Sequence, residues 1–316
     1  MLRCVLWTYR QFRLPGWSTA DCDNRYTVFS TAAKMSSFSH LVRFESEDGA
    51  VYFADLGPDA DGPPSPGAKL SGAKTIEALA QKSEEDIVTV RRLLPPLPRD
   101  GLPIYCVGLN YRSHAKEASL DIPACPPLWT KPAAALASPG EEIPVNDFCA
   151  KSLLDYEGEL VFVTSKDAKN VSASEAKNYI LGYTIGNDLS CRMYQLPRYS
   201  AGQFFFAKAF DKFAPIGPSL ISPAIFGDGS AFDVVTRVNG DVRQTAEFAQ
   251  DLIFSPEKIL SHMSQGTTIP AGTAVMTGTP AGVGAFRQPK SFLQDGDVVE
   301  VEMKKVGVLR NKIRFE

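Results

Sequence analysis

The sequence predicts an α+β protein that is mainly β, built on a large, mixed, mostly antiparallel sheet system. Short apolar runs bounded by turn residues recur along most of the chain, and few segments have helical spacing. Two dipeptides that favour β-hairpin turns, Asp48-Gly49 and Asn239-Gly240, stand between such runs. The predicted strands after residue 100 cover residues 104–109, 158–164, 180–185, 232–238, 274–277 and 298–303, with helices at 174–179 and 256–264.

Residues 1–34 are set apart from the fold prediction. Residues 1–20 contain Arg3, Arg10 and Arg13 and no acidic residue, which is the profile of a mitochondrial transit peptide. The other interpretation is an untranslated or disordered leader of a different kind, because a new start is possible at Met35. The sequence leaves open a cytoplasmic or a mitochondrial location.

The sequence predicts a small N-terminal α+β domain at residues 35–98 and a larger domain at residues 99–316. Two strands joined by the Asp48-Gly49 turn are expected over residues 38–56. Apolar residues at helical spacing predict a helix from residue 75 to about residue 94. The proline-rich residues 95–98 end that helix and act as a stiff linker.

The composition excludes several classes of function. A length of 316 residues with 44% hydrophobic content is enough for a sizeable core. A net charge of -3 does not indicate the basic surface that binds nucleic acid. No run approaches the ~20 apolar residues that a membrane-spanning helix needs. Six scattered cysteines without a CxxC pair indicate free thiols, and neither a disulfide framework nor a zinc site.

Two glutamates on one predicted strand carry the first functional signal. Glu157 and Glu159 are two residues apart, so on a strand they share a face, about 6–7 Å apart. They head an apolar run that should enter the core, where two like charges are costly unless something neutralises them. A cation is the simplest neutraliser. The alternative is a strand end with two solvated glutamates.

A third acid, Asp188, follows the predicted strand at 180–185. An acid at a strand end can also cap the next helix, which is the alternative interpretation. Three carboxylates without a His or Cys cluster would make an all-oxygen site, which suits Mg²⁺, Mn²⁺ or Ca²⁺ and disfavours zinc.

Four motifs in this order resemble the metal-binding core of the fumarylacetoacetate hydrolase superfamily. They are Tyr156-Glu157-Gly158-Glu159-Leu160 and residues 182–192, 208–218 and 277–284. The resemblance covers about residues 103–316. It implies a mixed β-sandwich roll, a homodimer, and Glu157, Glu159 and Asp188 as ligands of a divalent metal, Mg²⁺ in the first instance.

Two lysines are candidate site residues. Lys208 follows three phenylalanines, and desolvation among aromatic rings would lower its pKa and suit it to proton transfer or to holding an enolate. Alternatively its stem packs on the rings and its head reaches water. The resemblance places Lys208 on the family's active-site lysine. It also places Lys131 in a Lys-Pro motif, where we expect it to help bind an anion.

Three further residues are expected to contact the substrate. Arg192 and Gln195 share a face on one helical turn, and a guanidinium is shaped to grip a carboxylate. The alternative is a surface pair. Members resembling acylpyruvases and oxaloacetate decarboxylases use these two positions for the substrate. Thr279 lies in a Gly-Thr-Pro turn whose N–H groups and hydroxyls can cradle a carboxylate, although such a turn is also ordinary.

His114 and Glu117 form the last candidate pair. Their spacing of three places them within hydrogen-bond reach on one helix face, where the carboxylate makes the imidazole a better general base for water. A surface His–Glu pair is the alternative. The family's C–C-cleaving members carry such a dyad at this position.

The resemblance therefore implies an enzyme, either a metal-dependent hydrolase of C–C bonds in ketonic substances or a related decarboxylase. The expected substrate is a small 2-oxo acid of the acylpyruvate, fumarylpyruvate or oxaloacetate type, and cleavage passes through a metal-stabilised enolate. One alternative is a keto–enol tautomerase, or an isomerase or hydratase of 2-oxo diacids. Another is a non-catalytic metal-binding pathway protein.

Overall fold

The structure is a computed structural model, and it describes residues 38–83 and 85–316. The leader or transit peptide predicted for residues 1–34 lies outside the described residues. The described residues belong to one compact unit, residues 34–316. The domain boundary predicted after residue 98 stays a prediction, because a strand of the N-terminal part, β1, pairs with β13 of the larger part.

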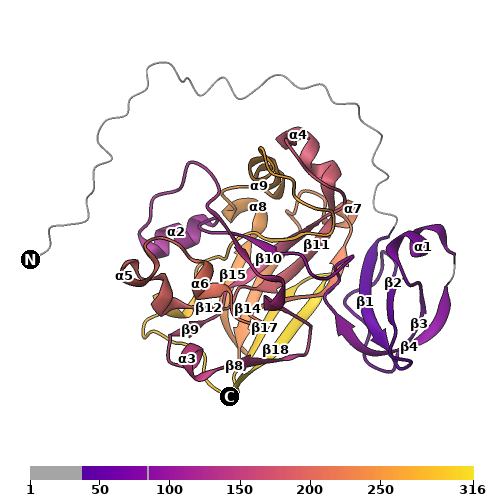
Figure 1. The fold of residues 1–316 in the computed structure, drawn as a ribbon, viewed down its shortest axis with the longest axis horizontal. Helices are drawn as coiled ribbons and strands as arrows, with labels where there is room; N and C mark the ends of the chain where they lie inside the picture. The colour runs from indigo at the N-terminus through magenta and orange to yellow at the C-terminus, as the bar shows by residue number, and fades with distance from the viewer. Residues whose placement is uncertain (1–37, 84) are drawn as a thin grey trace, which may run out of the picture. The chain divides into compact units, whose positions relative to one another are not determined.

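The fold is mainly β and its sheets are mixed, which confirms the predicted class. The 11-stranded sheet has the order β3 (Lys69–Gly72), β4 (Asp86–Leu94), β1 (His40–Ser46), β13 (Ala214–Ile221), β11 (Ile180–Asn187), β10 (Gly158–Thr164), β16 (Ala274–Met276), β5 (Ile104–Val107), β6 (Leu128–Lys131), with β2 (Val51–Asp55) beside β1 and β7 (Leu136–Ala137) beside β13 (Figure 1). The 5-stranded sheet has the order β15 (Asp241–Glu247), β14 (Asp233–Val238), β17 (Val298–Met303), β18 (Gly307–Phe315), β8 (Glu142–Val145). The strands β9 (Leu154–Asp155) and β12 (Ser190–Cys191) form a 2-stranded sheet.

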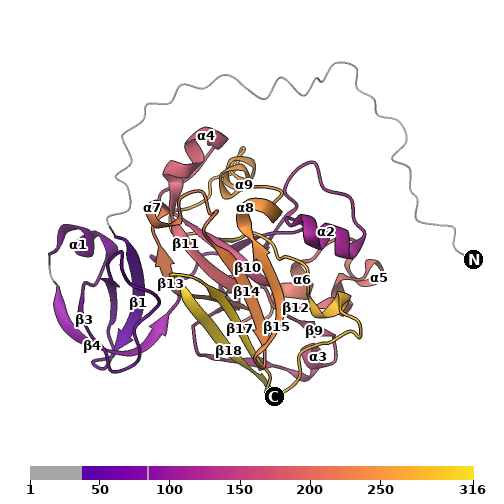
Figure 2. The same cartoon turned by 180° about the vertical axis from the view of Figure 1, so that it is seen from behind.

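The helices are short and gather in groups. They are α1 (Ile76–Gln81), α2 (Arg112–Ala118), α3 (Asp147–Ala150), α4 (Ala173–Ala176), α5 (Pro197–Ser200), α6 (Phe205–Lys208), α7 (Pro223–Phe226), α8 (Phe248–Asp251) and α9 (Pro256–Met263), with 3-10 turns η1 (Ala133–Ala135), η2 (Lys177–Tyr179), η3 (Arg192–Gln195) and η4 (Gly284–Phe286). In both views α4, α7, α8 and α9 gather at one end of the sheets, whereas α2, α3, α5 and α6 lie beside β9 and β12 (Figures 1 and 2). None of the described helices is long and apolar enough to cross a membrane.

Both predicted hairpins are present. The strands β1 and β2 pair across Asp48-Gly49, and β14 and β15 pair across Asn239-Gly240. In the second turn φ is 53° at Asn239 and 84° at Gly240. A two-residue turn with positive φ at both positions matches the twist of the flanking strands, and Asn and Gly tolerate that backbone best.

The helix predicted from residue 75 to residue 94 is wrong over its second half. The helix α1 ends at Gln81, where Lys82 follows with a left-handed φ of 50°. Residues 86–94 instead form the strand β4, paired with β1 and β3. Four consecutive β-branched residues, 87–90, favour a strand, and this local preference together with the pairing outweighs the apolar spacing.

The core between the two larger sheets explains the position of the site. Side chains of β10 and β11 pack there against side chains of β14, β17 and β18. Every residue of β10 is buried, and so is nearly every residue of β11. Any polar side chain at the start of β10 or at the end of β11 therefore faces the interior and needs polar partners there.

Candidate active site

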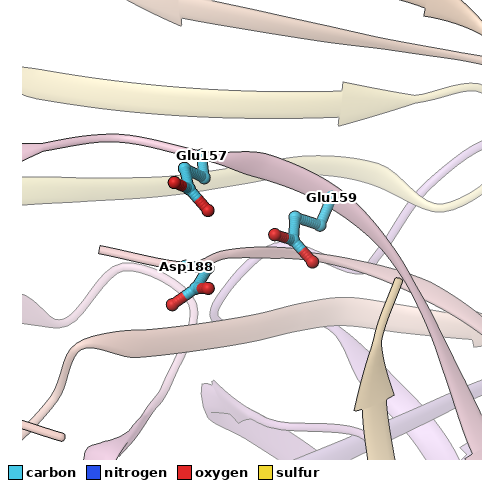
Figure 3. A group of neighbouring side chains, drawn as sticks. All are labelled: Glu157, Glu159 and Asp188. Carbon is cyan, nitrogen blue, oxygen red and sulfur yellow. The ribbon is translucent and has the colours of Figure 1, made fainter. Parts of the chain in front are cut away.

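The three predicted acids meet at one point of the large sheet. Glu157 immediately precedes β10 and Asp188 immediately follows β11, and the antiparallel register sets Gly158 opposite Asn187. The N–H of Asp188 donates to the carbonyl of Glu157 at 2.8 Å. Glu159 lies one residue into β10. One carboxylate oxygen from each acid lies within 4.8 Å of the others, and the three carboxylates point toward one another (Figure 3).

The triad is an arrangement that can bind a divalent metal. Glu159 and Asp188 are fully buried and Glu157 is 6% exposed. The Oε2 atom of Glu159 accepts the N–H of Gly278 at 2.7 Å, whereas its Oε1 atom is buried without a hydrogen-bond partner. Burial, Asp188 and Glu157 raise the pKa of Glu159 well above its ordinary value. A bound cation would give Oε1 of Glu159 a partner and would offset the repulsion among the three carboxylates. The residues therefore fit a divalent ion.

Lys208 partly neutralises the triad. Its Nζ donates to Glu157 at 2.8 Å, to Asp188 at 2.6 Å and to the hydroxyl of Ser190 at 2.7 Å. Burial raises the pKa of Glu157, but the charges of Lys208 and Arg192 outweigh burial and lower that pKa to about 2. Glu157 is therefore ionised at every physiological pH.

The predicted direction of the Lys208 pKa shift is wrong. Burial lowers the pKa of Lys208, but Asp188 and Glu157 outweigh burial and raise that pKa above its ordinary value. The cause is the direction of the side chain. Phe205 and Phe206 are about half exposed, while Nζ points to the carboxylates and lies 5.3 Å from the ring centroid of Trp129.

Lys131 lies behind Asp188 and not on a surface that a substrate reaches. Its side chain is fully buried, and Nζ lies 2.6 Å from Oδ1 of Asp188. The same Nζ donates to the carbonyls of Leu189 at 3.1 Å and Phe213 at 2.5 Å. The structure therefore gives Lys131 the position of a group that orients Asp188.

Arg192 joins the triad to an acid that the sequence reasoning did not assign. Its Nε donates to Asp155 at 2.7 Å, and its Nη1 donates to Glu157 at 2.5 Å and to Gln195 at 3.0 Å. The Nη2 atom is buried without a partner. Asp155 is fully buried and also accepts the N–H groups of Gly284 and Ala285. The signal for it was present, because Asp155, Glu157 and Glu159 alternate along the sequence.

The His–Glu pair forms on α2, as its spacing predicted. The Nδ1 atom of His114 lies 3.1 Å from Oε2 of Glu117, and the side chains are 13% and 20% exposed. Glu117 also accepts the N–H of Gly282 at 2.9 Å through Oε1. The ring of Phe286 meets the His114 ring edge-on, with 5.7 Å between centroids. Glu117 is thus held from two sides and in turn holds the imidazole.

A cavity of about 200 Å³ joins these groups. Its wall includes His114, Glu157, Arg192, Gln195, Lys208 and Thr279. The hydroxyl of Thr279 already donates to the carbonyl of Gly158 at 3.0 Å and accepts the amide of Gln244 at 2.8 Å. A ligand at Thr279 would therefore have to use other atoms than this hydroxyl hydrogen.

The charges of the ion-pair network around the triad do not balance. Four acids and three bases converge there: Asp155, Glu157, Glu159, Asp188, Lys131, Arg192 and Lys208. One carboxylate is left without a counter-charge, and Glu159 is the one whose pKa is raised. A divalent cation would reverse the sign of this excess and make the cavity attractive to an anion.

Comparison with known proteins agrees with this geometry. The family model described as Fumarylacetoacetate (FAA) hydrolase C-terminal matches residues 103–314. A caffeoylpyruvate hydrolase of Neonothopanus nambi is 34% identical over 297 residues, which are 89% of this chain and 95% of that protein. The human protein named oxaloacetate tautomerase FAHD2A, mitochondrial, is 33% identical over 254 residues, 76% of this chain and 80% of that protein. A solved 5-carboxymethyl-2-hydroxymuconate delta-isomerase from Mycobacterium smegmatis is similar with a TM-score of 0.69 and 30% identity, covering 88% of this chain and 99% of that one. The chain therefore belongs to the fumarylacetoacetate hydrolase family.

Proposed function

We propose that the protein is a divalent-metal-dependent enzyme that cleaves a C–C bond in a small 2-oxo acid. The reaction is hydrolysis of an acylpyruvate or fumarylpyruvate, or decarboxylation of oxaloacetate. The observation that carries the proposal is the His114–Glu117 pair, whose imidazole lines the same cavity as Glu157 and Lys208. A general base beside a metal-ligating cluster is the combination that hydrolysis of a carbon–carbon bond requires.

The proposed metal is Mg²⁺, with Mn²⁺ or Ca²⁺ as alternatives. Glu157, Glu159 and Asp188 would hold it through oxygen atoms, which these hard cations prefer. When bound, the cation supplies Lewis-acid polarisation of the 2-oxo group and positive charge for an enolate. Lys131 keeps Asp188 in place, since its Nζ is tied to that carboxylate and to two carbonyls.

The basic groups of the wall would bind the substrate anion. The unpartnered Nη2 of Arg192 is a donor for one carboxylate oxygen, and the neighbouring Gln195 adds a neutral amide. Lys208 stays protonated, because its carboxylate neighbours raise its pKa. Its fixed charge favours an enolate that forms nearby, without a proton transfer from Lys208 itself.

His114 would act as the general base in the hydrolytic reaction. The imidazole takes a proton from water, and the water oxygen adds to the distal carbonyl of the substrate. The bond between that carbonyl and the neighbouring CH₂ carbon breaks, and its electron pair becomes the enolate of pyruvate. The enolate then takes up a proton, so that pyruvate and a carboxylic acid are released. Glu117 holds the imidazole and stabilises its protonated form.

A second candidate is keto–enol tautomerisation or double-bond isomerisation. It is favoured by the relatives, one named an oxaloacetate tautomerase and one solved as a delta-isomerase. These reactions pass through the same enolate but move only a proton. They need no water activated by His114, and this difference separates the candidates.

The test measures pyruvate formed from acetylpyruvate and oxaloacetate, with Mg²⁺ and with EDTA, for the unchanged protein and for His114→Ala. We expect cleavage that EDTA abolishes, and a loss of about 10²–10⁴-fold in kcat for His114→Ala with acetylpyruvate. His262→Ala on α9 is the control. Enol–keto conversion without pyruvate formation would identify the tautomerase. No metal-dependent turnover of any 2-oxo acid would leave the non-catalytic alternative.

The homodimer and the location are separate proposals. The homodimer is implied by the resemblance, and molar mass measured by light scattering tests it. A mitochondrial location is supported by the basic, acid-free residues 1–20 and by the human relative named as mitochondrial. Imaging of the full chain fused at its C-terminus to a fluorescent protein tests it, and a diffuse cytoplasmic signal would contradict it.

A further inference from the structure

The cavity has a polar and an apolar wall. Beyond the groups already described, it is lined by a set of apolar residues: Leu109, Ala118, Leu120, Trp129, Phe204 and Phe286. Trp129 and Phe204 meet edge to face, with 5.8 Å between ring centroids. The proposed enolate chemistry uses none of these side chains. They therefore bear on which substrate the cavity accepts.

Two of these apolar residues are exposed at the cavity. Leu120 is 57% exposed and Phe286 is 41% exposed. Leu120 follows α2, and Phe286 ends η4, so two separate segments bring apolar surface to one place. Exposed apolar surface beside a concave polar site is typical of a site that binds an apolar group.

The cationic donors of the cavity are nearly all in use. Each of the three N–H donors of Lys208 has a partner in Glu157, Asp188 or Ser190. The Nε and Nη1 atoms of Arg192 also have acceptors, and only its Nη2 is left. Among the described lining residues, no cationic donor of Lys208 or Arg192 is left for a second carboxylate.

We infer that the preferred substrate is a monocarboxylic 2,4-dioxo acid whose acyl substituent is apolar or aromatic, and that Leu120 and Phe286 determine this preference. This inference rests on the proposed function. The carboxylate end would meet Arg192, and the acyl substituent would cover the apolar wall. A dicarboxylic substrate such as oxaloacetate would instead place its second charge against apolar side chains, which costs the hydration of that charge.

The first experiment compares kcat/KM for pyruvate formation from three substrates with Mg²⁺. They are 2,4-dioxo-4-phenylbutanoate, acetylpyruvate and oxaloacetate, whose distal groups are a phenyl ring, a methyl group and a carboxylate. We expect the phenyl substrate to exceed acetylpyruvate by about tenfold or more, because a buried apolar group of this size discriminates by at least that factor. Oxaloacetate is expected to be the poorest. An equal or reversed order overturns the inference and leaves the proposed function standing.

The second experiment places a cation on the apolar wall. Leu120→Arg should raise the ratio of kcat/KM for oxaloacetate to that for the phenyl substrate by about tenfold. Ile122→Arg is the matched control, because Ile122 lies two residues further on, is 51% exposed and does not line the cavity. The control should leave the ratio unchanged. A similar ratio change in both variants, or none in Leu120→Arg, contradicts the inference. If neither variant nor the unchanged protein turns over any of the three substrates, the proposed function itself has failed.

Discussion

The floor and the rim of the cavity differ in how they are held. We call Glu157, Glu159, Asp188, Lys131 and Lys208 the floor, and all five are at most 6% exposed. The rim consists of His114, Glu117, Leu120 and Phe286, which lie on short helices and loops and are partly exposed. The register of β10 and β11 fixes the three acids of the floor, whereas a few hydrogen bonds fix the rim.

This difference separates stability from chemistry. The floor charges compensate one another in the interior, so removing one leaves a buried charge that its remaining neighbours offset less completely. The rim groups reach solvent, so a substitution there should cost little free energy of folding. It should instead alter the general base or the substrate specificity. Variants of the floor should therefore lower the free energy of unfolding, and variants of the rim should lower kcat or change the preferred substrate.

The largest expected effect is on the floor. Lys131→Met removes one of the two buried lysines that pair with Asp188 and should lower the free energy of unfolding by about 3–5 kcal/mol in urea titrations. Lys212→Met is the control, because Lys212 forms an ion pair with Glu141 and its side chain is 37% exposed. That change should cost at most about 1 kcal/mol. Equal losses would show that the floor charges are not structurally coupled.

A rim variant should show the opposite pattern. Glu117→Gln keeps an oxygen for the N–H of Gly282 but removes the charge beside His114. We expect kcat for acylpyruvate hydrolysis to fall by about 10²-fold, and the free energy of unfolding to change by no more than about 0.5 kcal/mol. The KM should change little, since Glu117 holds the base and does not line the cavity. A large loss of stability with unchanged kcat would give Glu117 a structural role only.

Local signals made much of the fold and of the triad predictable. The Asn239-Gly240 turn depends on two backbone angles that only a few residue types adopt readily. The prediction that Glu157 and Glu159 share a face depends on the two-residue period of a strand. The polar residues Asn187 and Asp188 mark the end of the strand predicted at 180–185. In each case neighbours along the chain carry the information.

A third prediction concerns the backbone of the floor. In Gly158→Ala the added Cβ would meet Oγ1 of Thr236 at 2.0 Å, so strand β10 or β14 must shift. We expect a loss of about 1–3 kcal/mol in unfolding free energy. Metal affinity measured by calorimetry should fall as well, because Gly158 lies between Glu157 and Glu159.

A double-mutant cycle checks the cause of that loss. Thr236→Ala removes the clashing hydroxyl, so Gly158→Ala should cost less in that background than in the unchanged protein. If the two costs simply add, the clash is not the reason for the loss.

What the sequence did not show depends on contacts across long distances. The strand at 86–94 was predicted as a helix, because its partners β1 and β3 are not visible in the local apolar spacing. The pKa of Lys208 was predicted to fall, because the phenylalanines are adjacent in sequence while the carboxylates of Glu157 and Asp188 are adjacent only in space. The alternation of Asp155 with Glu157 and Glu159 is visible in the sequence, but its ion pair with Arg192 is not, because Arg192 lies 37 residues away.

The smallest expected effect lies outside both the floor and the rim. His40 on β1 is fully buried, its Nε2 lies 2.7 Å from the hydroxyl of Ser219, and burial lowers its pKa below the ordinary value. The folded state then resists protonation more than the unfolded state does. Stability from the neutral imidazole is complete above a pH of about 6.5 and declines as the pH falls through that value toward the folded pKa. His40→Asn should therefore lose less unfolding free energy than the unchanged protein between pH 7.5 and pH 5.5 in paired urea titrations, and its kcat should be unaltered. An identical pH dependence in the two proteins would show that His40 does not titrate in this range, and a change in kcat would connect β1 to the cavity after all.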